Sequence, residues 1–199
     1  MLTLSPKAQQ LILDFEGFSH PGQWPGKDSG ITVGHGYDLG YCTKDQFLAD
    51  WGERLPAPTV QRLLPVIGLT GIRAKNRAPL LSDLRIPKKA AAEVFTLRSV
   101  PRMVSDTLLA FPGVDKLPAD AAGALVSLVY NRGGSMKDKP GSDNRREMRA
   151  IRDECAKAKP ALKAMAGQIR SMKRLWQGQG VDGLLRRREA EAVLLEGAV

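Results

Sequence analysis

The sequence predicts an α+β protein that is mostly α. Over most of the chain, apolar residues recur at the spacing of an amphipathic helix, and proline or glycine separates the helical segments. One short segment, residues 31–38, instead alternates in the manner of a strand. The β part is therefore small, and we expect a small β-hairpin lobe and a larger helical lobe.

Length and composition favour a single domain over residues 1–199, with a β-rich lobe at about 18–42 and helices over 1–17 and 43–199. The chain has 199 residues, 43% of them hydrophobic, which is enough for one substantial core. Its two cysteines, Cys42 and Cys155, are far apart in sequence, as is typical of a reducing compartment. No segment approaches the roughly 18 apolar residues of a membrane span, and no secretory signal is recognisable. We therefore expect synthesis in the cytoplasm.

The first predicted helix is capped by Ser5 and ends at Glu16, before Gly17. At this carbonyl-rich end, next to Phe15 and Phe18, the helix dipole and desolvation favour a protonated carboxyl group. A carboxyl group that stays protonated near neutral pH can act as a general acid. The alternative is a frayed, exposed glutamate without a chemical role, and position alone does not separate the two.

The strand-like segment ITVGHGYD places two kinds of residue on opposite faces. Ile31, Val33 and Tyr37 share the face that we expect to be buried. The other face carries Thr32 and Asp38, with Gly34 and Gly36 between them, where a ligand could lie against bare backbone. A twisted, glycine-rich hairpin without a ligand is the alternative.

Two carboxyl groups and a hydroxyl group on facing elements suit glycoside hydrolysis. The run FEGF followed by SGITVGHGYDLG also resembles the lysozyme domain of pesticin and its phage and bacterial relatives, a branch of the bacteriophage-lysozyme superfamily. The resemblance implies a lysozyme-like fold with a cleft between the lobes. It also implies a muramidase that cleaves peptidoglycan with inversion and without a cofactor or metal. Glu16 then matches the general acid, and Thr32 and Asp38 match the groups that hold the attacking water.

The second carboxylate has a competing candidate. Better-known phage lysozymes place their aspartate between the glutamate and the threonine, and Asp28 occupies that interval here. Asp38 is favoured because GYDLG matches the pesticin-like pattern and because strand alternation puts Asp38 on the Thr32 face. For an inverting pair, the carboxyl groups of Glu16 and Asp38 should lie roughly 6.5–9.5 Å apart.

The remaining chain reads as helical. Thr43 has the spacing of a capping box, and residues 59–84 resemble short helices that join the two lobes. The segment after Pro118 is apolar almost all round, which predicts a buried central helix. It ends in Tyr130, Asn131 and Arg132, which are candidates for sugar binding by resemblance; an ordinary helix end with a turn at Gly133 is the alternative.

The last predicted helix, from Gly183, resembles the carboxy-terminal GLxxRRxAExxL pattern of the same family. By that resemblance, Arg187 would support the site by pairing with Glu16. A basic face exposed to solvent is the alternative for each arginine of this run.

The charge is strongly positive, with 30 Lys and Arg against 21 Asp and Glu. Such a protein binds polyanions or gains solubility. We favour peptidoglycan and the anionic polymers of the wall or outer membrane over nucleic acid, and expect a monomer. A phage endolysin would need a holin for release, whereas an antibacterial toxin would need a secretion system and an immunity protein.

Other chemistries have little support in the sequence. Two histidines and two scattered cysteines do not form a zinc-ligand pattern, and His35 is expected to pack against the core beside Tyr37. Two alternatives to the muramidase stay open. One is a lytic transglycosylase that needs only Glu16, and the other is a basic module without catalytic activity that binds wall polymer or nucleic acid.

Overall fold

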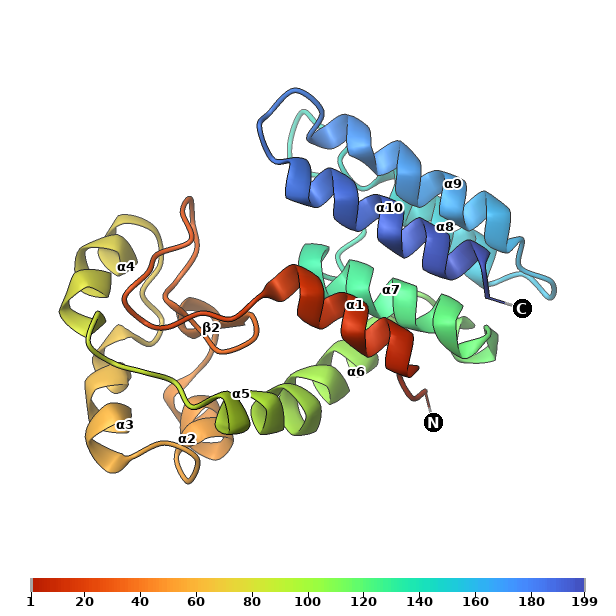
Figure 1. Cartoon of the computed structure of the whole chain (residues 1–199). Coiled ribbons are helices and arrows are strands. Elements are labelled where there is room, and N and C mark those ends of the chain that lie inside the picture. Colours follow the sequence, from red (N-terminus) through yellow and green to blue (C-terminus); the bar gives the residue numbers. More distant parts are fainter. Residues whose placement is uncertain (1, 199) are drawn as a thin grey trace. The chain divides into compact units, whose positions relative to one another are not determined.

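The computed structural model describes residues 2–198 and is mostly helical, with one two-stranded antiparallel sheet (Figure 1). This confirms the predicted α+β class with predominant helix. The chain forms two compact units: one runs from Glu16 to Pro101, and the other combines the chain up to Phe15 with the chain from Arg102. We call them the hairpin unit and the helical unit. No helix within residues 2–198 has the length and apolarity needed to cross a membrane.

The hairpin unit contains far more than the hairpin. After β1 (Thr32–Val33) and β2 (Tyr37–Asp38) come short 3-10 turns and the helices α2 (Lys44–Trp51), α3 (Ala57–Leu63), α4 (Gly71–Arg77) and α5 (Lys88–Val94). Residues 59–84, predicted to join two lobes, lie inside this unit as short helices. α5 continues through a π-helical turn, Phe95–Ser99, into α6 (Val100–Ala110), and the boundary between the units falls just after Pro101.

The hairpin is anchored to the core of its unit through its apolar face. That core gathers buried side chains from the strands and the helices: Ile31, Val33, Leu39, Phe47, Trp51, Leu63 and Val94. Tyr37 meets Trp51 edge-on and donates its hydroxyl proton to Asp50 Oδ2 at 2.8 Å. Because a buried phenol needs a polar partner, Asp50 allows Tyr37 to point into the core.

The helical unit is organised around α7 (Ala119–Arg132), in which residues 121–129 are all buried. This confirms the predicted buried helix after Pro118. α1 (Pro6–Glu16) begins with the Ala8 amide donating to Ser5 Oγ at 3.1 Å, as predicted for an N-cap. α10 (Asp182–Glu196) runs alongside α9 (Leu162–Ser171), which packs against α8 (Arg146–Cys155), and α10 also packs against α7 (Figure 1).

Two arginines of α10 are buried rather than exposed, so the solvent-face alternative is wrong for them. Arg187 and Arg188 are 2% and 0% exposed, and both bind Glu191, which is also fully buried. Ser127 of α7 donates to Glu191 Oε1 at 2.7 Å and accepts from Arg187. The two cations and one carboxylate thus join α10 to the central helix inside the core.

Replacement of Glu191 should therefore be costly. Removing one partner of a buried ion pair leaves its charge uncompensated, so Glu191→Gln should lower the free energy of unfolding by about 3–5 kcal/mol. Denaturant titration measures this loss. Glu53→Gln, at an exposed position, is the matched control and should change stability by less than about 0.5 kcal/mol. Equal effects of the two substitutions would contradict the role assigned to Glu191.

Candidate active site

The pairing of β1 with β2 places Thr32 directly opposite Asp38 and Val33 directly opposite Tyr37. Val33 and Tyr37 are buried, whereas Thr32 and Asp38 are partly exposed. This confirms that Thr32 and Asp38 share the face opposite the core. Directly opposed residues in an antiparallel pair have Cβ atoms about 4.5–5.5 Å apart, so both side chains can contact one small ligand or water molecule.

Asp38 is fixed by two backbone amides. Its Oδ1 accepts the Gly40 amide at 2.8 Å, and its Oδ2 accepts the Gly30 amide at 3.1 Å. Desolvation by burial outweighs these bonds and raises the pKa of Asp38 above its ordinary value of 3.8. Because each carboxylate oxygen can accept more than one hydrogen bond, each retains acceptor capacity for water.

Gly30 and Gly40 form a cradle around Asp38 that the sequence analysis missed. A Cβ atom on Gly30 would lie 2.2 Å from Asp38 Oδ1, and one on Gly40 would lie 2.7 Å from Thr70 Cγ2 and 2.8 Å from the Gly30 Cα atom. Glycine at 30 therefore allows the close approach of the Asp38 carboxylate, whereas glycine at 40 allows the close approach of Thr70 and of the Gly30 backbone. Gly30 and Gly40 are the first and the last glycine of the motif SGITVGHGYDLG, so both were visible in the sequence. That both bind Asp38 became visible only in the fold.

Thr32 leaves its hydroxyl group available. Within residues 2–198, the Thr32 side chain makes no hydrogen bond to another residue, although its β-strand backbone is paired with Asp38. A hydroxyl group can both donate and accept. Thr32 can therefore orient a water molecule whose other contact is the carboxylate across the hairpin.

Glu16 is the last residue of α1, as predicted, and Gly17 ends the helix in the left-handed conformation with φ of 62°. The chain after Glu16 is tied to the hairpin turn by a pair of backbone bonds. Ser19 donates to the Gly34 carbonyl at 2.9 Å, and Gly34 donates back to Ser19 at 2.9 Å. The hairpin unit therefore contains Glu16, Thr32 and Asp38 and connects the segment after Glu16 directly to the hairpin.

The structure gives Gly34 a packing role. Gly34 is buried, with φ of 60°, and an added Cβ atom would lie 2.9 Å from the Ala91 Cβ atom and 3.1 Å from Trp51. Its amide and carbonyl groups are both occupied by Ser19. Packing against Ala91 and Trp51 thus accounts for glycine at 34. The absence of a side chain at this position is therefore no longer a reason to expect that a ligand lies there. Gly36, with φ of 70°, is partly exposed, and its contact with a ligand stays a prediction.

Asp28 lies in an exposed loop of the same unit, and its backbone carbonyl accepts the Tyr41 hydroxyl proton at 2.8 Å. It has neither the opposed hydroxyl group nor the backbone cradle that Asp38 has. The geometry therefore favours Asp38 as the second carboxylate.

The predicted sugar-binding residues lie at the end of α7 in the helical unit. Asn131 and Arg132 line a hollow of about 380 Å³, together with Lys139, Asn144, Arg145, Leu175, Trp176 and Leu184. The Arg132 guanidinium lies 4.9 Å from the centre of the Trp176 ring and donates to the Asn144 carbonyl at 2.6 Å. Burial, reinforced by the charges of Arg145 and Arg188, lowers the pKa of Arg132 to about 10. Tyr130, partly exposed, is not among the residues that line this hollow.

Two further features at this helix end bear on the predictions. Gly133 forms the turn expected of an ordinary helix end, with its amide bound to the Val129 carbonyl. Arg145 donates to the Arg132 carbonyl at 2.8 Å and so satisfies one of the last carbonyls of α7. The predicted pair of Arg187 with Glu16 joins residues of the two units and stays a prediction.

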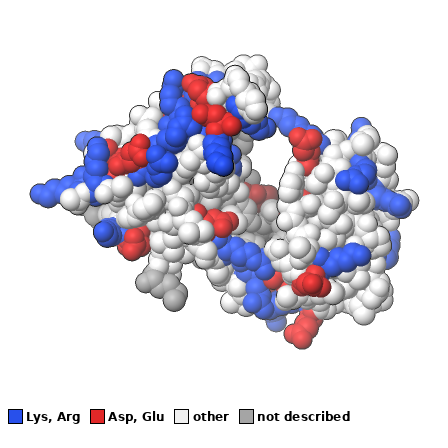
Figure 2. All heavy atoms as spheres, turned by 180° about the vertical axis from the view of Figure 1, so that it is seen from behind, with Lys and Arg blue, Asp and Glu red and all other residues white. Residues whose placement is uncertain are grey.

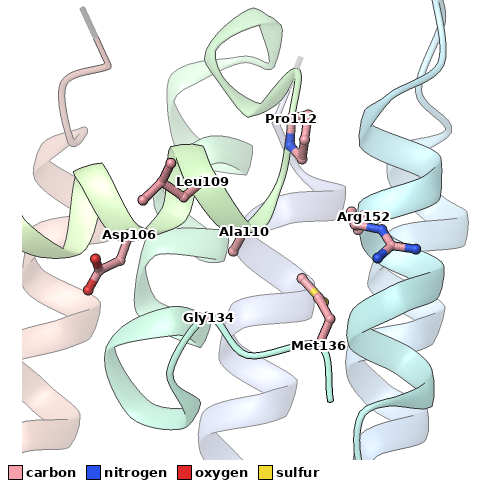
Figure 3. A pocket seen from close by; sticks show the side chains of 7 residues that line it. All are labelled: Asp106, Leu109, Ala110, Pro112, Gly134, Met136 and Arg152. Carbon is pink, nitrogen blue, oxygen red and sulfur yellow. The ribbon is translucent and has the colours of Figure 1, made fainter.

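A second hollow in the helical unit has a volume of about 510 Å³ and contains none of the predicted site residues (Figure 3). It is lined by Asp106, Leu109, Ala110, Pro112, Gly134, Met136 and Arg152. Leu109 is 82% exposed, which is the highest exposure among the exposed large hydrophobic residues described.

A thiol nucleophile is disfavoured. Cys42 and Cys155 are both buried, and burial raises the pKa of each thiol, to about 12 for Cys155. A thiol nucleophile reacts as its thiolate, which these sites oppose. His35 is packed, as predicted, with its ring against those of Phe18 and Phe95. It lies in the turn between the strands, partly exposed, with Nδ1 at 2.8 Å from the Gly17 carbonyl.

The glycine cradle can be tested without an activity assay. Gly30→Ala would push the new methyl group against Asp38, so it should weaken the amide bond to the carboxylate, raise the pKa of Asp38 further and lower the free energy of unfolding by about 1–3 kcal/mol. Carboxyl titration by NMR and denaturant unfolding measure both effects. Gly167→Ala, in a helix with nothing within 4 Å of the new methyl group, should instead preserve or raise stability. An unchanged Asp38 pKa in Gly30→Ala would contradict the cradle.

Comparison with known protein families and with curated proteins gives no significant match to this chain. The likeness to the pesticin-type lysozyme domain is therefore carried by its short motifs. Any assignment of activity depends on the geometry of the hairpin unit.

Proposed function

We propose that this protein is an N-acetylmuramidase with a lysozyme-like fold and a substrate cleft. It would hydrolyse the β-1,4 bond between N-acetylmuramic acid and N-acetylglucosamine in peptidoglycan. The observation that carries the proposal is the register of the hairpin, which sets Thr32, whose hydroxyl group has no partner within residues 2–198, directly opposite Asp38. An inverting glycosidase needs a base on the water side that is separate from its acid, and this pair supplies it.

The roles follow from proton balance. Glu16, protonated, gives its proton to the glycosidic oxygen as the bond to the anomeric carbon breaks. A water molecule between Thr32 and Asp38 attacks that carbon from the opposite side and passes a proton to Asp38. The two backbone amides on Asp38 hold the carboxylate in place, so its remaining lone pairs point in fixed directions. Asp38 ends protonated and Glu16 ionised, and exchange of one proton with solvent restores both.

The water-side pair separates hydrolysis from the first alternative. A lytic transglycosylase forms an anhydro sugar by internal attack and needs no group to hold water. In that reaction the Asp38 carboxylate and the Thr32 hydroxyl group opposite it would have no chemical task. The hairpin register therefore favours hydrolysis.

The charged surface gives little support to the second alternative, a basic module without activity. On the face shown in Figure 2, Lys and Arg are interspersed with Asp and Glu rather than gathered into a field of one sign. Several arginines are paired, among them Arg62 with Asp83 and Arg174 with Glu147. Binding driven mainly by nucleic-acid phosphate favours basic residues clustered on one face, which the face in Figure 2 does not show.

The proposal extends to substrate and setting. Asn131 and Arg132, at the hollow of the helical unit, would contact the sugar chain, and anionic wall polymers would meet the remaining positive charge. The protein would act as a monomer on peptidoglycan after release by a holin or by a secretion system, in the latter case with an immunity protein in the producing cell.

Product analysis is the direct test. Digestion of purified peptidoglycan should give reducing muramic acid ends, identified by mass spectrometry, and early products should carry the α configuration because the single displacement inverts the β bond. NMR of the fresh products reports the configuration. Anhydromuramic ends would establish the transglycosylase instead. If the peptidoglycan stays intact, the remaining hypothesis is the binding module without catalytic activity.

Variants separate the two aspartates. Asp38→Asn removes the base on the water side, so kcat should fall by about 10²–10⁴-fold, the usual range for a lost general base. Asp28→Asn is the matched control and should leave kcat within about twofold, because its loop position is exposed and outside the hairpin register. Glu16→Gln should abolish cleavage without unfolding the protein.

The pH profile gives an independent check on Asp38. Because its pKa in the folded protein is raised above 3.8, it becomes protonated, and useless as a base, at a pH higher than an ordinary aspartate would. The acid limb of kcat/KM should accordingly lie above pH 3.8 and should be lost from the residual activity of Asp38→Asn. If Asp28→Asn abolishes activity while Asp38→Asn retains it, the second carboxylate is misassigned.

A further inference from the structure

His35 lies within the motif SGITVGHGYDLG but has no role in the mechanism proposed above. It occupies the turn between β1 and β2, flanked by Gly34 and Gly36, which both have positive φ angles of 60° and 70°. These glycines let the chain turn so tightly that the His35 side chain is carried to the end of α1. There, Nδ1 lies 2.8 Å from the carbonyl oxygen of Gly17, the residue that follows Glu16.

The hydrogen bond between His35 and Gly17 can have only one direction. A carbonyl oxygen only accepts, so Nδ1 must carry the proton that is shared with Gly17. In the neutral ring this fixes the tautomer and leaves Nε2 as an acceptor.

Two aromatic rings contact the imidazole ring of His35. Phe18 and Phe95 meet it edge-on, with centroids 5.3 Å and 5.8 Å from that of His35. Phe95 is 2% exposed and begins the π-helical turn, and Gly34 is wedged against Ala91 and Trp51. Through Phe95, the imidazole ring of His35 is in contact with the buried part of the hairpin unit.

The Gly17 carbonyl lies in the short segment between the end of α1 and Phe18, whose side chain packs against the core of the hairpin unit. Gly17 has φ of 62°, and an added Cβ atom there would meet nothing within 4 Å. The backbone bonds between Ser19 and Gly34 hold the chain two residues further on. The His35 bond adds a hydrogen bond to Gly17 itself, the residue that follows Glu16.

We propose that His35 is a positioning residue, which holds the Gly17 carbonyl and thereby fixes Glu16 relative to Thr32 and Asp38. The proposal rests on the proposed muramidase function, in which Glu16 is the proton donor. A displacement of about 1 Å in a catalytic group can cost about 10²-fold in rate, so one hydrogen bond at this point has a large effect on turnover.

Two variants separate the hydrogen bond from the packing. His35→Leu fills the space between the phenylalanines but has no donor, and we expect kcat to fall about 10–100-fold with KM within about twofold of wild type. His35→Asn places an amide nitrogen at the same number of bonds from Cβ as Nδ1. It should therefore restore the bond to Gly17 and bring kcat to within about threefold of wild type. Unfolding of both variants, followed by circular dichroism, shows whether stability explains the difference.

The other histidine supplies the matched control. His20 also meets Phe18 edge-on, at 5.2 Å, but its Nδ1 accepts the Ile86 amide instead of contacting Gly17. Asn at position 20 keeps an acceptor for that amide, so His20→Asn should leave kcat within about twofold.

Three results would overturn the proposal: full kcat in His35→Leu, a kcat of His35→Asn as low as that of His35→Leu, or an equal loss of kcat in His20→Asn. Nitrogen NMR of the imidazole gives a readout that does not need activity. A proton on Nδ1 of His35 supports the bond, and a neutral ring protonated only on Nε2 refutes it. If the wild-type protein cleaves no peptidoglycan, the proposed function fails, whereas the tautomer still decides whether His35 binds Gly17.

Discussion

The arrangement of the hairpin unit depends on the two backbone amides that bind Asp38. A pair of strands with only two residues each has too few ladder bonds to be stable by itself. The Asp38 side chain adds bonds to Gly30, just before β1, and to Gly40, just after β2, and so closes the open end of the hairpin. At the other end, Ser19 and Gly34 exchange backbone bonds. The bonds of the Asp38 side chain and of the Gly34 backbone thus stabilise a hairpin whose strands are too short to be stable by themselves.

These same contacts decide what Asp38 can do chemically. A solvated aspartate is a weak base with many orientations, whereas this carboxylate has a raised pKa and fixed oxygens. Burial that makes it a stronger base also makes its ionised form less favourable in the fold, and the two amides offset part of that cost. Stability and reactivity therefore vary together at this position.

Sequence patterns predicted what depends on neighbours along the chain. The end of α1 at Glu16, the buried run of α7 and the shared face of Thr32 and Asp38 all follow from helix caps or from the period of a strand. Features that depend on distant residues were missed. Gly34 is packed against α5, Arg187 and Arg188 share the Glu191 carboxylate inside the core, and Gly30 meets Asp38. A glycine or an arginine in a sequence does not show which partner will surround it.

The strongest objection to a catalytic role for Asp38 is that its structural role already explains an aspartate there. The two amides bind different oxygens of Asp38, and asparagine would place an NH₂ group, which cannot accept, at one of these two positions. That objection does not account for Thr32. Valine has nearly the same shape and a higher strand propensity, and it would serve equally well at a strand position whose side chain bonds to nothing within residues 2–198. In the proposed mechanism a water molecule lies between Thr32 and Asp38, and a threonine hydroxyl group, unlike the valine side chain, can hold it.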